Sequence, residues 1–209
     1  MTQDKVFLDG EGDAWYRRNR ENQPPQADDF VMIEAYRLID AEDKRRAIVE
    51  FGCSDGWRLR RLLFLYPERL RCTGLDPSRD AIRAGECSHK ALSPVAPEDH
   101  LRLSCSTIEQ KVSDSDAYFD IAICAFVLHW VDRKHLATAI SNIDWTIRPG
   151  GHLILSDFWE DRPVRRRYHH REDQEVWTYH QDYAQCFLEL GTYIRSARHK
   201  WSTEDNYNS

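Results

Sequence analysis

The sequence predicts an α/β fold: a doubly wound, mostly parallel sheet that carries helices on both faces. The first observation is that apolar, strand-like runs alternate with segments of helical periodicity from residue 46 onward. The second is a glycine-containing turn, in residues 50–56, between the first such strand and the first such helix. Strands joined by crossover helices run parallel, because each helix returns the chain to the same end of the sheet.

Ahead of this alternation, residues 1–27 are expected to form an N-terminal arm or lid, and residues 28–209 a single domain. The arm is polar and charged, with a short helix predicted over residues 13–20. The next helix is predicted over about residues 30–41, and Asp28 and Asp29 are suitable caps for it because a carboxylate can accept from the first free backbone N–H groups.

The remaining elements follow from periodicity and from glycine and proline positions. Strands are expected near residues 46–51, 71–76, 100–105, 119–125 and 152–158, and helices near residues 55–66, 78–86 and 133–147. A polar insert rich in arginine and histidine follows over residues 159–176, and then a helix near 180–190 and a strand over 193–201.

Composition limits the class of protein. The chain has 209 residues, 41% hydrophobic and 31% charged, which suits one globular domain with its own core. No apolar run approaches the ~18 residues of a membrane helix, and the N-terminus has no apolar signal core, so a cytoplasmic protein is expected. The six cysteines show no zinc-like spacing and are expected to be reduced, with no metal site. A net charge of −6 makes a broad nucleic-acid surface unlikely.

The turn in residues 50–56 reads EFGCSDG, with an acid two positions before its first glycine. Its glycines are four apart, which differs from the dinucleotide-binding pattern. The stretch resembles the first motif of class I S-adenosylmethionine-dependent methyltransferases, acid-x-Gly-x-Gly-x-Gly, with Ser54 in place of the middle glycine. The resemblance covers roughly residues 45–200 and implies a Rossmann-like fold, methyl transfer and S-adenosyl-L-methionine as the cofactor.

The family's fold usually ends with an antiparallel seventh strand. After the strand expected over residues 193–201, only residues 202–209 remain, and they are too short and polar to form it. Either the chain is truncated or the sheet has six strands.

The turn is expected to bind the amino-acid end of the cofactor. The small residues Gly52, Cys53, Ser54 and Gly56 would let the backbone close on the ligand, since a larger side chain would hold it away. Glu50 would hold the cofactor's amino group, directly or through water.

The ribose and adenine are expected to lie beside the next two strands. Asp76 ends the second strand, where a carboxylate can accept from both ribose hydroxyls, and Pro77 would flank the adenine. Ser106 and Thr107 follow the third strand, where family members often carry an acid; they either substitute for it with hydroxyl or backbone groups or form a plain loop.

The fourth strand ends in the segment AFVLHW, which matches the family's pattern of a strand that ends below the cofactor. Ala125 and Phe126 should lie near the methionine part, and Trp130 near the acceptor. His129 is the titratable residue expected nearest the methyl group, and it is either a general base or a structural residue at the start of the next helix.

The arm is similar to the arms of methyltransferases from bacterial surface-sugar and secondary-metabolite pathways. Trp15, Tyr16 and Asn19 therefore either fold over the cofactor as a lid or belong to a solvated amphipathic arm.

The insert concentrates positive charge in an otherwise acidic chain. In the family's topology it would lie over the acceptor side of the pocket, where arginines bind carboxylates or phosphates bidentately. Residues expected to bind or deprotonate an anionic acceptor are Arg165, Arg166, Arg167, Tyr168, His169 and His170. The alternative is a solvated loop whose arginines pair with neighbouring acids.

The leading hypothesis is methyl transfer to an oxygen or nitrogen of a small, anionic metabolite by direct in-line attack. The alternatives are methylation of RNA or a protein, and a catalytically silent cofactor-binding protein. A nicotinamide oxidoreductase is disfavoured because its glycine pattern is missing. The sequence predicts no oligomeric state.

Overall fold

A computed structural model describes residues 2–20, 29–92, 98–112, 119–171 and 175–199. The expected boundary between arm and domain, at residues 27 and 28, lies outside these ranges, as do residues 202–209 and the end of the strand expected over 193–201. No helix in the described ranges is long and apolar enough to cross a membrane.

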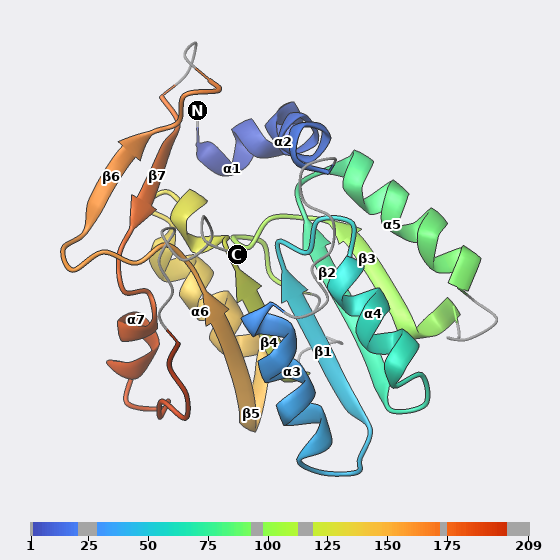
Figure 1. Cartoon of the computed structure of the whole chain (residues 1–209). Coiled ribbons are helices and arrows are strands. Elements are labelled where there is room, and N and C mark those ends of the chain that lie inside the picture. The colour runs from blue at the N-terminus through green and yellow to red at the C-terminus, as the bar shows by residue number, and fades with distance from the viewer. Residues whose placement is uncertain (1, 21–28, 93–97, 113–118, 172–174, 200–209) are drawn as a thin grey trace, which may run out of the picture.

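The core of the molecule is a parallel sheet with the strand order β3-β2-β1-β4-β5 (Figure 1). Its strands are β1 Arg46–Phe51, β2 Leu70–Asp76, β3 Leu101–Cys105, β4 Phe119–Ala125 and β5 Ile147–Ser156. The central strand β1 pairs with β2 on one side and with β4 on the other. The doubly wound, Rossmann-like fold class is therefore confirmed, and in the described residues the sheet has these five strands.

Helices cover both faces of this sheet. The helices α3 Phe30–Asp40, α4 Trp57–Leu65 and α5 Arg79–Leu92 pack on one face, and α6 Leu136–Thr146 and α7 Ala184–Leu188 on the other. Alternate residues of β1 separate the two cores, since Ile48 packs on the α3 side and Val49 on the α6 side. Asp29 caps α3 as predicted, because its Oδ1 accepts from the backbone N–H of Met32 at 2.8 Å.

Two additional parts lie beyond the carboxyl ends of the strands. The arm consists of α1 Gln3–Val6, a π-helical turn Phe7–Glu11 and α2 Gly12–Asn19. The strands β6 Val164–Arg167 and β7 Trp177–His180 form an antiparallel hairpin. Figure 1 shows the arm lying across the carboxyl edge of the sheet, from the hairpin to the start of α5.

Polar contacts fasten the arm to the hairpin. The side chain of Gln3 donates to the backbone carbonyl of Trp177 at 3.0 Å and accepts from its N–H at 2.6 Å. The buried carboxylate of Glu11 accepts from the hydroxyl of Tyr168 at 2.9 Å and forms an ion pair with Arg18 at 2.5 Å.

The other end of the arm is held at the start of α5. The carboxylate of Asp13 accepts from the hydroxyl of Ser78 at 2.7 Å and from the backbone N–H of Asp80 at 3.0 Å. Arg17 forms an ion pair with the side chain of Asp80. The arm is therefore a strap attached on both sides of the sheet's carboxyl edge.

Two sequence predictions were wrong in the C-terminal half of the chain. Residues 193–199 form no strand; Tyr193 packs on the side chain of Phe187 and its hydroxyl donates to Asp144 at 2.8 Å, so side-chain contacts rather than a backbone ladder hold this segment. The strand expected from about residue 152 begins instead at Ile147, directly after α6 ends at Thr146, because Ile147 already pairs with β4 before the register shift at residues 119–121.

Candidate active site

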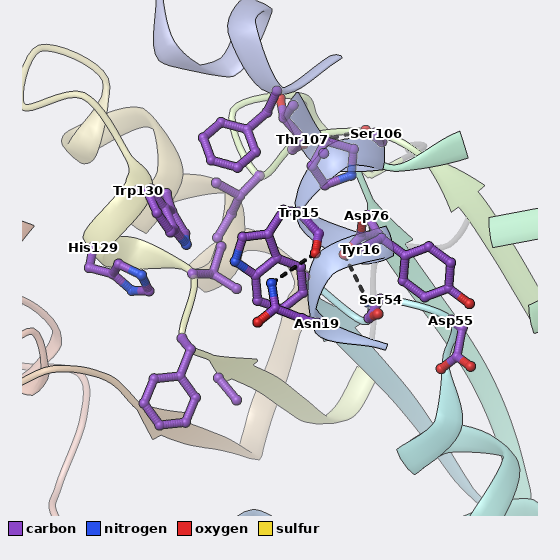
Figure 2. A pocket seen from close by; sticks show the side chains of 18 of the residues that line it. Trp15, Tyr16, Asn19, Ser54, Asp55, Asp76, Ser106, Thr107, His129 and Trp130 are labelled. Carbon is purple, nitrogen blue, oxygen red and sulfur yellow. Dashed lines mark hydrogen bonds between the residues drawn. The ribbon is translucent and has the colours of Figure 1, made fainter. Parts of the chain in front are cut away.

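A cavity of about 700 Å³ opens where β1, β2 and β4 end. Its position is the switch point of the sheet, because the chain leaves β1 toward β2 on one side and β4 lies on the other. Ligands of doubly wound sheets bind at such points, and the volume suits a small organic ligand. Figure 2 shows the arm residues Trp15 and Asn19 between one end of the cavity, beside Ser54 and Asp76, and the other end, beside His129 and Trp130.

The glycine turn forms one end of the cavity with unusual backbone angles. Gly52 has a φ of 67°, and a Cβ added there would lie 2.3 Å from the Cγ2 of Val127. Ser54, which replaces the family's middle glycine, has a φ of 53°, a conformation that glycine adopts more readily. Gly52 and Ser54 line the cavity, whereas the side chain of Cys53 is buried and does not.

Asp76 lies beside the turn and lines the cavity (Figure 2). Its Oδ2 accepts from the backbone N–H of Ser54 at 2.8 Å, and its Oδ1 accepts from the N–H of Ser78 at 2.8 Å. Removal from bulk water raises the pKa of Asp76 to about 6, although these two N–H groups oppose the rise. Each oxygen keeps a free acceptor position, so the carboxylate can receive two ligand hydroxyl groups.

Glu50 lies behind the turn, not in the cavity wall. Its Oε1 accepts from Arg58 at 2.9 Å, and Arg58 also donates to Asp29 at 2.9 Å. Burial raises the pKa of Glu50 to about 7, against the lowering effect of the Arg58 charge. The second oxygen, Oε2, is buried and has no hydrogen-bond partner in the described residues. An unpaired buried carboxylate oxygen beside this turn fits an ammonium donor.

Pro77, Ser106 and Thr107 complete this end of the cavity, as the sequence predicts for the adenine side. The hydroxyl of Ser106 already donates to the side chain of Gln110 at 2.7 Å. Gly56 ends the turn just outside the lining, with a φ of 70°. The remaining predicted cofactor residues of the arm, Trp15, Tyr16 and Asn19, also line the cavity.

The opposite end is formed where β4 and β5 end. Ala125 and Phe126 line it, and Phe126 has a φ of 59°, which is strained for a bulky side chain; its N–H donates to Ser156 at 2.7 Å. His129 also lines the cavity, and its Nδ1 lies 2.7 Å from the Oδ1 of Asp157. Both side chains are 3% exposed.

The carboxylate of Asp157 fixes the imidazole of His129. Asp157 also accepts from the backbone N–H of His129 at 3.2 Å, so the carboxylate holds both the main chain and the ring. With Nδ1 facing a carboxylate, Nε2 is the ring nitrogen left to accept a proton. A carboxylate that orients a histidine in this way is a common feature of general-base sites.

The structure does not bring the charged insert to the cavity. Arg165 and Arg166 lie on β6, where Arg165 stacks on Trp177 and Arg166 pairs with Glu160 at 2.6 Å. The reason is the hairpin, because β6 pairs only with β7 in the described residues and all four of its side chains are exposed. The insert residues absent from the cavity lining are Arg165, Arg166, Arg167, Tyr168, His169 and His170.

Unlike the exposed arginines of β6, Tyr168 is buried against the cavity wall and the arm. Its ring packs on Trp130, with centroids 4.8 Å apart, and its hydroxyl contacts Glu11 and Arg18 of the arm. Trp130 itself lines the cavity, so Tyr168 supports the cavity wall from behind.

Comparisons with known proteins agree with this geometry. Residues 19–199 match a family model described as a methyltransferase domain. The chain belongs to the methyltransferase family. The class I S-adenosylmethionine-dependent methyltransferase predicted from residues 50–56 is thus confirmed, and the match supports S-adenosylmethionine as the cofactor.

One curated relative of this methyltransferase is a malonyl-[acyl-carrier protein] O-methyltransferase of Halalkalibacterium halodurans. It is 27% identical over 141 residues, which are 66% of this chain and 49% of the relative. The chain therefore spans about half the length of the curated relative that it matches.

Solved structures share the fold of the methyltransferase at low identity. A 1,6-didemethyltoxoflavin-N1-methyltransferase of Burkholderia thailandensis, with S-adenosylhomocysteine bound, has a TM-score of 0.67 and 16% identity, covering 94% of this chain and 80% of that one. A sugar N-methyltransferase of Streptoalloteichus has a TM-score of 0.52 and 16% identity, covering 73% and 58%.

Several residues in or behind the cavity wall of the methyltransferase were not found from the sequence. Asp157 and Phe158 follow β5 directly, so an argument from the shared carboxyl edge of neighbouring strands could have placed them beside His129. Arg58 lies two residues after the turn, and its ion pair with Glu50 has no sequence signature. Phe7 reaches the cavity only because the arm folds back over the sheet. No cluster of metal-binding side chains occurs in the described residues.

Proposed function

We propose that this methyltransferase transfers a methyl group from S-adenosylmethionine to an oxygen or nitrogen of a small molecule by direct in-line attack. The observation that carries the proposal is a buried histidine, held by a buried carboxylate, that lines the same cavity as the ribose-type acid at its opposite end. When bound, the cofactor supplies an activated methyl group on a sulfonium. The chain's own residues then position two ligands and accept one proton.

The cofactor is proposed to bind along the turn. Asp76 accepts from the two ribose hydroxyls, since each of its oxygens keeps an acceptor position. The backbone of Gly52 and Ser54 approaches the amino-acid part, with the amino group near the unpaired oxygen of Glu50. Trp15 and Asn19 close over the ligand from the arm and exclude water.

His129 is proposed as the general base. Its Nδ1 is held by Asp157, so Nε2 accepts the proton of the attacking O–H or N–H group. A positioned base contributes typically ~10²–10⁴-fold in rate. Without such a pair, a purely cofactor-binding protein would be the simpler proposal.

An anionic acceptor was expected from the arginines of the insert, and those side chains lie outside the cavity lining. The relatives include a malonyl-[acyl-carrier protein] O-methyltransferase and a 1,6-didemethyltoxoflavin-N1-methyltransferase, so transfer to either oxygen or nitrogen has a counterpart. No feature of the described residues favours RNA or protein methylation over a small molecule.

The test is release of S-adenosylhomocysteine from S-adenosylmethionine in the presence of small molecules that carry O–H or N–H groups. Wild-type protein should release it with at least one acceptor. His129→Gln should lower kcat by at least about 100-fold while S-adenosylhomocysteine affinity stays within about twofold. Tight cofactor binding without release by any acceptor would support the silent cofactor-binding alternative instead.

A further inference from the structure

The end of the cavity around His129 is lined by a connected set of aromatic rings. Phe7 lies 5.1 Å from Trp130, Trp130 4.7 Å from His129, His129 4.8 Å from Phe158, and Phe158 5.4 Å from Phe126, all between ring centroids. All five residues line the cavity. We call this set the aromatic end: Phe7, Phe126, His129, Trp130 and Phe158.

Two of the four ring contacts in the aromatic end are edge to face: the planes of His129 and Phe158 make an angle of 78°, and those of Phe158 and Phe126 an angle of 62°. A planar ligand can add to such a set by stacking or by presenting its edge. Phe158 stacks on His180, with centroids 4.8 Å apart, yet it is still 41% exposed and has apolar surface that a ligand can remove from water.

One of these rings, that of Phe126, is attached to a strained stretch of backbone. Phe126 has a φ of 59°, a region that bulky side chains rarely adopt, and its N–H donates to the carbonyl of Ser156. Strained backbone that the surrounding structure enforces is concentrated at ligand sites. A phenylalanine held in this conformation indicates that the position of its ring matters for the site.

Two of the three arginines that line the cavity, Arg58 and Arg60, lie at the other end. Arg58 pairs with Glu50 and Asp29, and Arg60 bonds the carboxylate of Asp55, all beside the glycine turn. The third, Arg20, follows α2, and its charge acts on the hydroxyl of Tyr16 together with that of Arg60. The aromatic end therefore offers flat apolar surface and one oriented base, which is poor chemistry for binding a carboxylate or phosphate.

We infer that the acceptor is a planar aromatic or heteroaromatic ring that carries an O–H or N–H group. The ring packs among Phe126, Trp130 and Phe158 with its acidic hydrogen toward His129. In the transfer, the methyl–sulfur bond breaks and a methyl–oxygen or methyl–nitrogen bond forms. The sulfur keeps the bonding electron pair, and the acceptor's proton passes to Nε2 of His129. This inference rests on the proposed function and specifies its substrate class.

The test compares two alcohols of similar shape, β-naphthol and its saturated counterpart β-decalol, with malonate as an anionic probe. Each is titrated into the protein saturated with S-adenosylhomocysteine. β-Naphthol should bind saturably and at least about tenfold more tightly than β-decalol or malonate. Equal affinities, tighter malonate binding or no saturable β-naphthol binding would overturn the inference.

Variants locate the binding. Phe158→Ala and Phe158→Leu should each weaken β-naphthol binding at least about fivefold, and the leucine variant serves if the alanine variant does not fold. Phe64→Ala is the matched control, because Phe64 is an exposed phenylalanine of α4 outside the cavity lining. Unchanged β-naphthol affinity in both Phe158 variants would also overturn the inference. Failure of wild-type protein to bind S-adenosylhomocysteine would instead refute the proposed function.

Discussion

The two ends of the cavity are built from different parts of the chain. The end proposed for the cofactor consists mainly of one continuous turn, in which Gly52 and Ser54 adopt left-handed backbone angles and Asp76 accepts from the turn's own amide. The end proposed for the acceptor consists of side chains from the arm, from the segment after β4 and from the segment after β5. The first end depends on backbone geometry and the second on which distant side chains meet.

This difference has a functional consequence. A turn made of backbone can bind one ligand in the same way throughout a family, because few side chains are involved. An end made of side chains can change its ligand when a single ring is replaced by another residue. Substitutions at the two ends should therefore separate cofactor binding from acceptor use.

The largest expected effect is at the turn. Gly52→Val should abolish S-adenosylhomocysteine binding, because the added side chain meets Val127 and the φ of 67° is disfavoured for valine. Isothermal calorimetry measures the loss, and circular dichroism checks that the protein is folded. Gly150→Ala is the control: its φ is 76°, yet nothing lies within 4 Å of the added Cβ, so binding should be retained. Normal affinity in Gly52→Val would mean that the turn does not approach the ligand.

A smaller effect is expected at Asp157, which holds the ring of the proposed base His129. Asp157→Asn should lower kcat by roughly 10–100-fold, because the amide can no longer accept from the ring and the main chain as the carboxylate does. Cofactor affinity and the acceptor's KM should stay within about twofold.

A double variant of Asp157 and His129 distinguishes a positioning role of Asp157 from a general loss of structure. If Asp157 acts through His129, the double variant with His129→Gln should be no slower than His129→Gln alone. Additive losses in the double variant would show that Asp157 acts independently of the base.

The smallest effect is expected outside the cavity. Replacing Arg165, Arg166 and Arg167 together with alanine should change kcat and the acceptor's KM by less than about twofold, since these side chains are exposed and lie outside the cavity lining. Steady-state kinetics on the acceptor provide the measurement. A several-fold rise in KM would restore the interpretation that the insert recognises an anionic acceptor.

Sequence reasoning succeeded where the signal was local. The turn, the acid that ends β2 and the alternation of strands and helices all depend on neighbouring residues, and these predictions of the fold class and family are confirmed. Periodicity also identified the strand over residues 119–125 to the residue.

It failed where two distant segments decide the outcome. The sequence shows the positive charge of residues 165–167. Where that charge lies depends on the hairpin that residues 164–167 form with residues 177–180, and in this hairpin the arginines are exposed. The contact between Glu11 and Tyr168 joins residues 157 positions apart and has no local signature. The pair of His129 and Asp157 lies between these cases, since both follow neighbouring strands at the same edge of the sheet.

The central claim is that Asp76 holds the ribose of the cofactor at an end of the cavity separate from the base. Calorimetric titration of S-adenosylhomocysteine across pH tests it most directly. Burial raises the pKa of Asp76 to about 6 and that of Glu50 to about 7. Because the ribose hydroxyls and the amino group prefer ionised carboxylates, wild-type affinity should fall as pH drops below about 7, and more steeply below about 6. Asp76→Asn should bind at least about tenfold more weakly at pH 7.5, without the steeper fall below about pH 6, whereas His129→Gln should bind as the wild type does. Wild-type affinity in Asp76→Asn would contradict the assignment.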